Sequence, residues 1–240
     1  MIKLLKGVRQ KLLTEKRVVE YLIYAIGEIF LVVIGILIAL QINNWNDDRK
    51  EKNLESQLIN LLITDLEEKR AENIADITAT NQMIERFEAT IHMWETHHVI
   101  DTVNLRQNLR SLGGDSYFQN ESSPIYAGLL STNFWKQIPD SLNRQVDNIY
   151  RIRLKRVGVA FEKASEYGTH CKLNFLVTND MIDLKQKTQV IQKKVEMVSD
   201  DYISYSKLFI TTATRLKLRL EESKREIDKL IESLKRYNES

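Results

Sequence analysis

The distribution of apolar residues along the chain changes at residue 42. From Tyr21 to Ile42 the sequence reads YLIYAIGEIFLVVIGILIALQI, where apolar residues occupy every side of a helix and Glu28 carries the one charge. A run of about 20 such residues can cross the ~30 Å hydrocarbon layer of a membrane. Beyond it, apolar residues recur every three or four positions, as in amphipathic helices. We predict a transmembrane helix over residues 21–42 and a helical domain over residues 43–240.

Two apolar stripes predict that this helix continues well past the apolar run. The stripe residues are Leu54, Leu58, Leu61, Leu62 and Leu66, followed near heptad spacing by Ile77, Ile84, Phe87, Ile91 and Trp94. Neither Pro nor Gly occurs between Asn43 and Asp101. We therefore expect one helix from Tyr21 to about Thr96.

Further helices follow a break at Gly113-Gly114. Ser123 before Pro124 is typical of an N-cap and first helical position, and Pro139-Asp140 begins a longer helix. The apolar positions of that helix are Leu142, Val146, Ile149, Val157, Phe161, Ala164, Cys171 and Phe175. The last helix runs from about Ser199 to Tyr237, with a seam of Leu216, Leu220, Ile227, Leu230, Leu234 and Tyr237. The fold class expected is all-α: one N-terminal transmembrane helix continuing into an elongated antiparallel helical bundle or coiled coil.

Composition supports helices and excludes some functions. The chain has 2 Pro and 8 Gly among 240 residues, with 28% charged residues, too few turn residues for a sheet protein. A net charge of +2 argues against a nucleic-acid partner. The single cysteine, Cys171, cannot form an internal disulfide, and its place on an apolar stripe predicts burial.

The residues flanking the apolar run predict its orientation. Residues 1–20 form a basic, amphipathic tail, and the side after the run begins with neutral and acidic residues. The basic residues of the tail are Lys3, Lys6, Arg9, Lys11, Lys16 and Arg17. Since basic flanks stay in the cytoplasm, we expect an inner-membrane protein with a cytoplasmic N-terminus and a periplasmic bundle over residues 43–240. The run is longer than a signal-peptide core, which favours an uncleaved anchor.

Aromatic residues mark both ends of the expected span. Tyr21 and Tyr24 lie at its start and Trp45 lies just after its end. Such rings gather at the headgroup level of a bilayer, so we assign these three residues as interface anchors in contact with membrane lipids.

A face of small residues lies within the expected span and is bordered by a carboxyl group. The face consists of Gly27, Leu31, Gly35 and Ala39, with Glu28 beside it. Small residues allow close helix packing, and a polar group can bond across such an interface, so we expect a homo-oligomer or a second membrane protein here. Glu28 then acts either as a protonated hydrogen-bonding group between helices or as a proton or ion relay.

The sequence shows no catalytic set, and no catalytic, cofactor-binding or metal-ligating residue is assigned. His92, His97 and His98 lack the i, i+4 spacing of helical metal ligands. The basic run Arg151, Arg153, Lys155 and Arg156 is either a solvated face or a docking patch for an acidic partner or lipid headgroup.

The N-terminal part resembles a large family of uncharacterised single-span proteins, often present as several paralogues in one Gram-negative genome. The resemblance rests on YAIGEIFLVVIGILIALQINNWN and, more loosely, on the Ser-Pro-x-Tyr opening at Ser123-Pro124-Ile125-Tyr126. It implies the topology and no activity.

These observations together lead to three functional hypotheses. The first is a non-enzymatic, oligomeric inner-membrane protein whose periplasmic bundle binds or scaffolds partners in the cell envelope. The second is a subunit of an ion-driven or signal-transmitting complex that uses Glu28. The third is a periplasmic ligand sensor, which would need a cytoplasmic partner.

Overall fold

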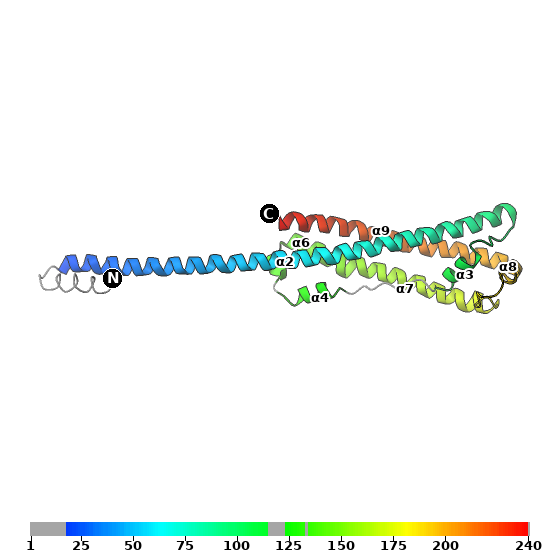
Figure 1. The fold of residues 1–240 in the computed structure, drawn as a ribbon, viewed down its shortest axis with the longest axis horizontal. Coiled ribbons are helices and arrows are strands. Elements are labelled where there is room, and N and C mark those ends of the chain that lie inside the picture. Colours follow the sequence, from blue (N-terminus) through cyan, green and yellow to red (C-terminus); the bar gives the residue numbers. More distant parts are fainter. Residues whose placement is uncertain (1–17, 115–122, 133, 240) are drawn as a thin grey trace. The chain divides into compact units, whose positions relative to one another are not determined.

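The computed structural model describes residues 18–114, 123–132 and 134–239 of the chain. These residues form helices and turns, and no strand occurs among them, which confirms the all-α fold class. The elements are α2 (Val18–His97), α3 (Leu105–Leu112), α4 (Pro124–Leu130), α5 (Phe134–Gln137), α6 (Asp140–Asp147), η1 (Asn148–Arg153), α7 (Leu154–Cys171), η2 (Lys172–Val177), α8 (Thr188–Met197) and α9 (Ser199–Asn238) (Figure 1). The chain divides into two compact units, residues 1–56 and 57–240.

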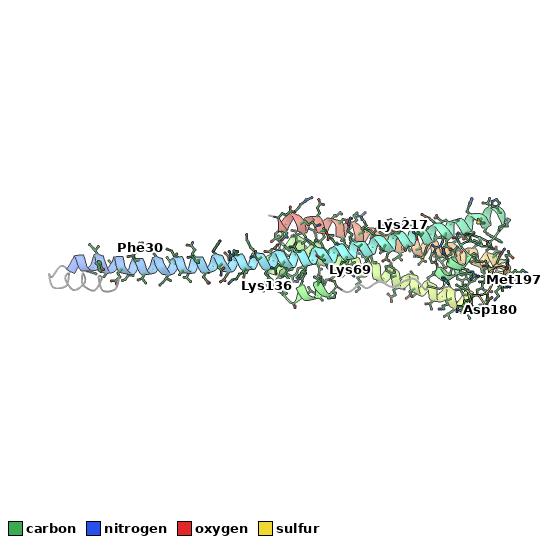
Figure 2. All side chains as sticks on the ribbon, in the orientation of Figure 1. Phe30, Lys69, Lys136, Asp180, Met197 and Lys217 are labelled. Carbon is green, nitrogen blue, oxygen red and sulfur yellow. The ribbon has the colours of Figure 1, made fainter. Side chains whose placement is uncertain are left out.

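The described part of the first unit is the N-terminal portion of α2. Side chains from residue 22 to residue 42 point out from the helix on all sides, as those around Phe30 do in Figure 2. Apart from Tyr24 and Ile34, which are half-buried, the large apolar ones among them are exposed, for example Leu31 at 71% and Phe30 at 63%. α2 is the one described helix that is long and apolar enough to cross a membrane, and none of its apolar window is buried. The tail expected over residues 1–20 falls largely outside the described residues.

Local signals in the sequence account for several helix ends in the second unit. Ser123 Oγ accepts a hydrogen bond from the Tyr126 amide at 3.0 Å, and Pro124 occupies the first turn of α4, as predicted. α2 ends where His98 adopts φ +53°, a left-handed conformation that stops helical propagation.

Two large apolar clusters and one small one form the interior of residues 57–240. One cluster gathers α4, α5, α6, η1 and the C-terminal part of α9 around α2 residues such as Leu62 and Leu66. The other surrounds Phe87 of α2, whose ring lies 4.3 Å from that of Phe209 of α9. The small cluster contains Val157, Phe161, Leu216 and Leu220. The seam predicted for α9 is buried from Leu216 to Leu234, as expected.

Polar pairs join α2 to α9. Residues early in α2 pair with residues late in α9, and residues late in α2 pair with residues early in α9. Glu67 pairs with Lys235 at 2.8 Å, and Glu95 pairs with Lys207 at 2.7 Å. Between them Asn73 donates to Ser223 Oγ at 3.1 Å, a buried contact. A buried amide–hydroxyl pair between two apolar regions fixes the register of two helices, because shifting either one would leave both groups unsatisfied.

The stripe predicted for residues 54–66 is correct only in part. Leu62 and Leu66 are fully buried, but Leu54 and Leu61 are half exposed, at 52% and 51%. Ile59 and Ile63 take the buried positions instead. Successive residues of an α-helix point about 100° apart, so Leu61 and Leu62 face different sides, and which side is buried depends on where the neighbouring helices lie.

The helix that begins at Pro139-Asp140 contains two π-helical turns that the sequence pattern did not predict. The eight apolar positions expected to face inward are all buried. The wide turn of η1 lets consecutive residues Ile149 and Tyr150 both face the core. Cys171 is fully buried as predicted, and burial raises the pKa of its thiol to about 11.

Two glycines allow the segment after α3 to approach α7 closely. Gly114 has φ +80°, and a Cβ built on Gly168 would lie 2.4 Å from the Gly114 Cα. Any side chain at Gly168 would therefore push the two backbones apart.

Candidate functional site

The residues of the predicted membrane interface lie exposed on α2. Gly27, Glu28 and Gly35 are exposed, as are Leu31 and Ala39. A Cβ built on Gly27 or Gly35 meets no atom within 4 Å, so the small-residue face is open. These residues are neighbours because they lie on one side of the same helix.

The predicted interface anchors are described in part. Tyr24 is half-buried, and the side chain of Tyr21 lies outside the described residues. Trp45 is 65% exposed, and the Arg49 guanidinium lies 5.6 Å from its ring centre. An exposed aromatic ring with a cation over its face has the amphipathic character of a headgroup-level side chain.

A buried polar cluster ties α4 to α2 and η1. The Asp65 carboxylate of α2 accepts hydrogen bonds from Ser123 Oγ at 2.8 Å and from the Tyr150 hydroxyl at 2.5 Å, both on one oxygen. The ring of Tyr126 stacks on that of Tyr150 at 4.3 Å, and the Tyr126 hydroxyl donates to Asp147 at 3.2 Å. The Ser-Pro-x-Tyr sequence thus supplies both a helix cap and two contacts to other elements.

The electrostatics of this cluster hold both phenols neutral. Burial, then the hydrogen bond to Asp65 and the charge of that carboxylate, raise the pKa of Tyr150 far above its ordinary value. Burial and the Asp147 carboxylate raise the pKa of Tyr126. The hydroxyl groups of Ser123 and Tyr150 are committed to Asp65 in the interior. The cluster therefore positions α4 and offers no activated nucleophile to solvent.

A groove of about 1040 Å³ lies between η1 and α7 on one side and α9 on the other. α7 and α9 pack against each other. Among the described residues that line it, the cationic ones are Arg151, Lys155, Arg156, Lys163, Arg215 and Arg219, and the one acidic residue is Glu222. Its apolar residues are Ile152, Val159, Ala160, Leu216 and Leu218. We call this surface the basic groove.

Half of the cations in the basic groove have local acidic partners. Arg151 lies 3.3 Å from Asp147, Lys163 lies 2.7 Å from Glu166, and Arg219 lies 2.9 Å from Glu222. The hydrogen bond from Arg219, with further nearby arginines, lowers the pKa of Glu222.

The other three cations, Lys155, Arg156 and Arg215, are exposed and form no ion pair with any described residue. Positive charge therefore dominates the groove.

The basic run identified in the sequence divides in the structure. Arg151, Lys155 and Arg156 line the groove, whereas Arg153 turns toward Glu222 at 3.8 Å and is half-buried. That the run faces Arg215 and Arg219 could not be predicted from the sequence, because it depends on the placement of α7 against α9.

The Asp65 cluster was also missed, although a signal for it exists. Asp65 lies within the apolar stripe between Leu62 and Leu66, where a carboxylate is expected to be buried and hydrogen-bonded.

Among the described residues no group of three or more His, Cys, Asp or Glu side chains could hold a metal ion. His92, His97 and His98 are exposed near the end of α2.

Comparison with known proteins identifies the family and nothing narrower. No curated protein and no solved structure matches the chain. Residues 28–157 match the Family of unknown function (DUF6090), and they include Glu28, Asp65, the Ser123–Tyr126 segment and the α7 side of the groove as far as Arg156. The expectation of an uncharacterised family is thereby confirmed. Because the match covers more than half of its 240 residues, the chain belongs to the Family of unknown function (DUF6090).

Proposed function

We propose that this chain is a non-enzymatic, oligomeric inner-membrane protein whose helical domain binds or scaffolds partners in the cell envelope. Residues 21–42 cross the membrane once, the N-terminus is cytoplasmic, and residues 43–240 form a periplasmic domain. One observation carries the proposal: the apolar side chains of residues 22–42 surround the helix and are exposed. Contiguous apolar surface on all sides of a helix is stable in lipid and unfavourable in water.

The interior of residues 57–240 supports an elongated, antiparallel bundle as the partner-binding domain. Ion pairs Glu67–Lys235 and Glu95–Lys207 connect opposite ends of the shared length of α2 and α9. Apolar clusters lie near both pairs of ends, with the Asn73–Ser223 hydrogen bond between them. A long bundle of this kind presents extended helical surfaces rather than a deep cavity, which suits binding of other proteins.

The open small-residue face supports assembly inside the membrane. Gly27 and Gly35 leave space where a second helix could approach. Glu28 borders this face, and a protonated carboxyl there could donate a hydrogen bond across a helix pair. We therefore place the oligomer contact at Gly27, Glu28, Leu31, Gly35 and Ala39.

The topology is tested with membranes that contain the full-length chain. The protein should stay in the pellet after carbonate extraction. Protease added to spheroplasts should digest residues 43–240, while a tag at the N-terminus should stay protected. A domain that is digested only after the inner membrane is ruptured would refute the orientation, and release by carbonate would refute the span.

Oligomerisation is tested by native mass spectrometry of the protein extracted in mild detergent. Gly27→Leu with Gly35→Leu should convert oligomers into monomers. Ile29→Leu with Ile36→Leu changes apolar residues off that face and serves as the matched control. A strictly monomeric wild-type protein without co-purifying membrane partners would refute the assembly proposal.

A second function is favoured by the position of Glu28 inside the apolar segment. An ionisable residue in a membrane helix is costly, and such residues often serve proton or ion pathways. The Glu28→Gln variant keeps a hydrogen-bonding amide but cannot bind or release a proton. Oligomers that persist in this variant while the cellular phenotype of a deletion strain is not restored would favour a relay over a packing role.

A further inference from the structure

We infer that the basic groove binds one acidic, amphipathic helix of a partner protein. The inference rests on the proposed function in one respect, since that function makes residues 57–240 a partner-binding domain. The groove then specifies where one partner binds and what chemistry it presents.

The charge of the groove selects an anionic partner. Six cationic side chains and one carboxylate line it, and Lys155, Arg156 and Arg215 lack a described ion-pair partner. These three residues come from both walls, two from α7 and one from α9. An acidic side chain placed between the walls would therefore be attracted from both sides. Such complementarity speeds association and selects against basic partners.

The apolar lining determines the shape of the occupant. Leu216 is fully buried at the floor, while Ile152, Val159 and Leu218 stay 42%, 46% and 52% exposed. A lining in which apolar residues alternate with cations matches a helix that carries both apolar anchors and acidic residues. This is the helix-in-groove mode of recognition, in which apolar anchors recur every three or four residues.

The length of the groove agrees with a helical ligand. Its wall formed by η1 and α7 extends from Arg151 to Lys163. At 1.5 Å per residue this wall is about 18 Å long, which corresponds to more than three turns of a bound helix.

Smaller or different anions would use only part of this surface. A free phosphate or lipid headgroup would engage the cations and leave Val159 and Leu218 in water. A single-stranded nucleic acid binds on aromatic side chains that stack with its bases, and the described residues that line the groove include none. The combination of charge and apolar lining is best satisfied by an amphipathic helix.

The test uses the full-length protein in detergent and a labelled synthetic helix of about 14 residues, or about 21 Å. The peptide carries leucine along one side and glutamate at its borders. A scrambled peptide of equal composition and charge is the peptide control. Fluorescence anisotropy should show saturable binding of the amphipathic peptide and at least about tenfold weaker binding of the scrambled one. Equal binding of both peptides would overturn the inference.

Charge reversal tests the groove itself. The triple variant Lys155→Glu, Arg156→Glu, Arg215→Glu should weaken binding by about tenfold or more. The matched control is Arg144→Glu, Lys172→Glu, Lys193→Glu, which changes the total charge equally at exposed positions outside the groove. Its effect should stay within about twofold at physiological salt, where distant charges are screened. Equal loss in both triple variants would show general attraction and overturn the inference.

Apolar variants distinguish a helix from a headgroup. Val159→Ser with Leu218→Ser should weaken peptide binding about fivefold or more, since buried methylene groups contribute affinity. Val190→Ser with Leu208→Ser, at exposed positions outside the groove, should have no effect. Unchanged affinity in the groove variant, together with displacement of the peptide by short-chain phosphatidylglycerol below its micelle concentration, would assign the site to lipid instead. Peptide binding is measured in detergent and does not depend on the orientation of the protein in a membrane. A negative binding result would therefore leave the proposed topology untouched, and a negative topology result would leave the binding result untouched.

Discussion

The two parts of α2 use apolar side chains in opposite ways. From residue 22 to 42 most of them are exposed on all sides of the helix, whereas from residue 57 to 97 most of the large ones are buried or half-buried, as Leu62, Leu66 and Phe87 are, and only Leu61 and Ile74 are exposed. The backbone is helical throughout Val18–His97, so secondary structure alone does not distinguish the parts. The difference lies in what surrounds each part: other helices cover one side of the second, whereas none of the apolar window of the first is buried.

The largest effect is expected from charges placed in the first part. Val33→Arg with Leu37→Arg introduces two cations at exposed apolar positions. Each should cost about 2.5–3.5 kcal/mol if the segment lies in lipid, enough to move most of the protein out of the carbonate-resistant fraction. Val190→Arg with Leu208→Arg, at exposed positions of α8 and α9, should leave membrane association unchanged. Equal fractionation of both variants would show that the two surfaces face the same solvent.

Two phenylalanines of α2 provide the next comparison. Phe87→Ala removes a fully buried ring that packs on Phe209 and should lower the unfolding free energy of the bundle by about 3–5 kcal/mol. Phe30→Ala removes a 63% exposed ring and should leave that free energy unchanged. Urea unfolding in detergent, followed through the fluorescence of Trp94 and Trp135, measures both. A comparable loss from Phe30→Ala would mean that residues 22–42 unfold together with the bundle.

How much of this structure the sequence predicts depends on the range of the interactions involved. Local signals were sufficient for α2, for the Ser123 cap and for α9. The exposure of Leu54 and Leu61 was not predicted, because which side of a helix is buried depends on where its neighbours lie. The π turn of η1 was missed for a similar reason: it accommodates Ile149 and Tyr150 together in a core formed by distant segments.

The candidate site shows the same limit. Arg151, Lys155 and Arg156 formed a visible run, but their opposing wall comes from α9, about 60 residues later in the chain. Asp65 could have been singled out as a carboxylate in an apolar stripe. Its partners, Ser123 and Tyr150, lie too far away in the sequence to be assigned without the fold.

Gly168 and Gly35 allow a comparison between a close backbone contact in the interior and an open helix face. Gly168→Ala forces a methyl group against the Gly114 backbone and should destabilise the bundle by about 1–3 kcal/mol. Gly35→Ala meets open space and should leave bundle unfolding unchanged. The same urea titration checks both variants, with circular dichroism to confirm helix content. Wild-type stability of Gly168→Ala would show that the backbones separate at no cost.

The smallest effect is expected when the carboxylates Asp65 and Glu28 of α2 are each replaced by the corresponding amide. Asp65→Asn keeps an oxygen where Ser123 and Tyr150 donate but removes the charge that strengthens both bonds. The expected loss is about 1 kcal/mol at neutral pH. Glu28→Gln makes the same chemical change in the exposed segment and should leave bundle unfolding unchanged at any pH.

The pH dependence of Asp65→Asn sharpens this test. Burial and the Asp65 carboxylate raise the pKa of folded Tyr150 above its ordinary value of 10.0, so its stabilising contribution is complete below pH 10 and is lost as the pH rises beyond it. Burial is the largest cause of the raised pKa of Tyr150 and remains in the variant, so both proteins should lose the same stability between pH 7 and about pH 10.5. Unfolding curves at these two pH values measure the gap between the two proteins. A gap that narrows at the higher pH would show that the charge of Asp65, rather than burial, keeps the phenol of Tyr150 neutral.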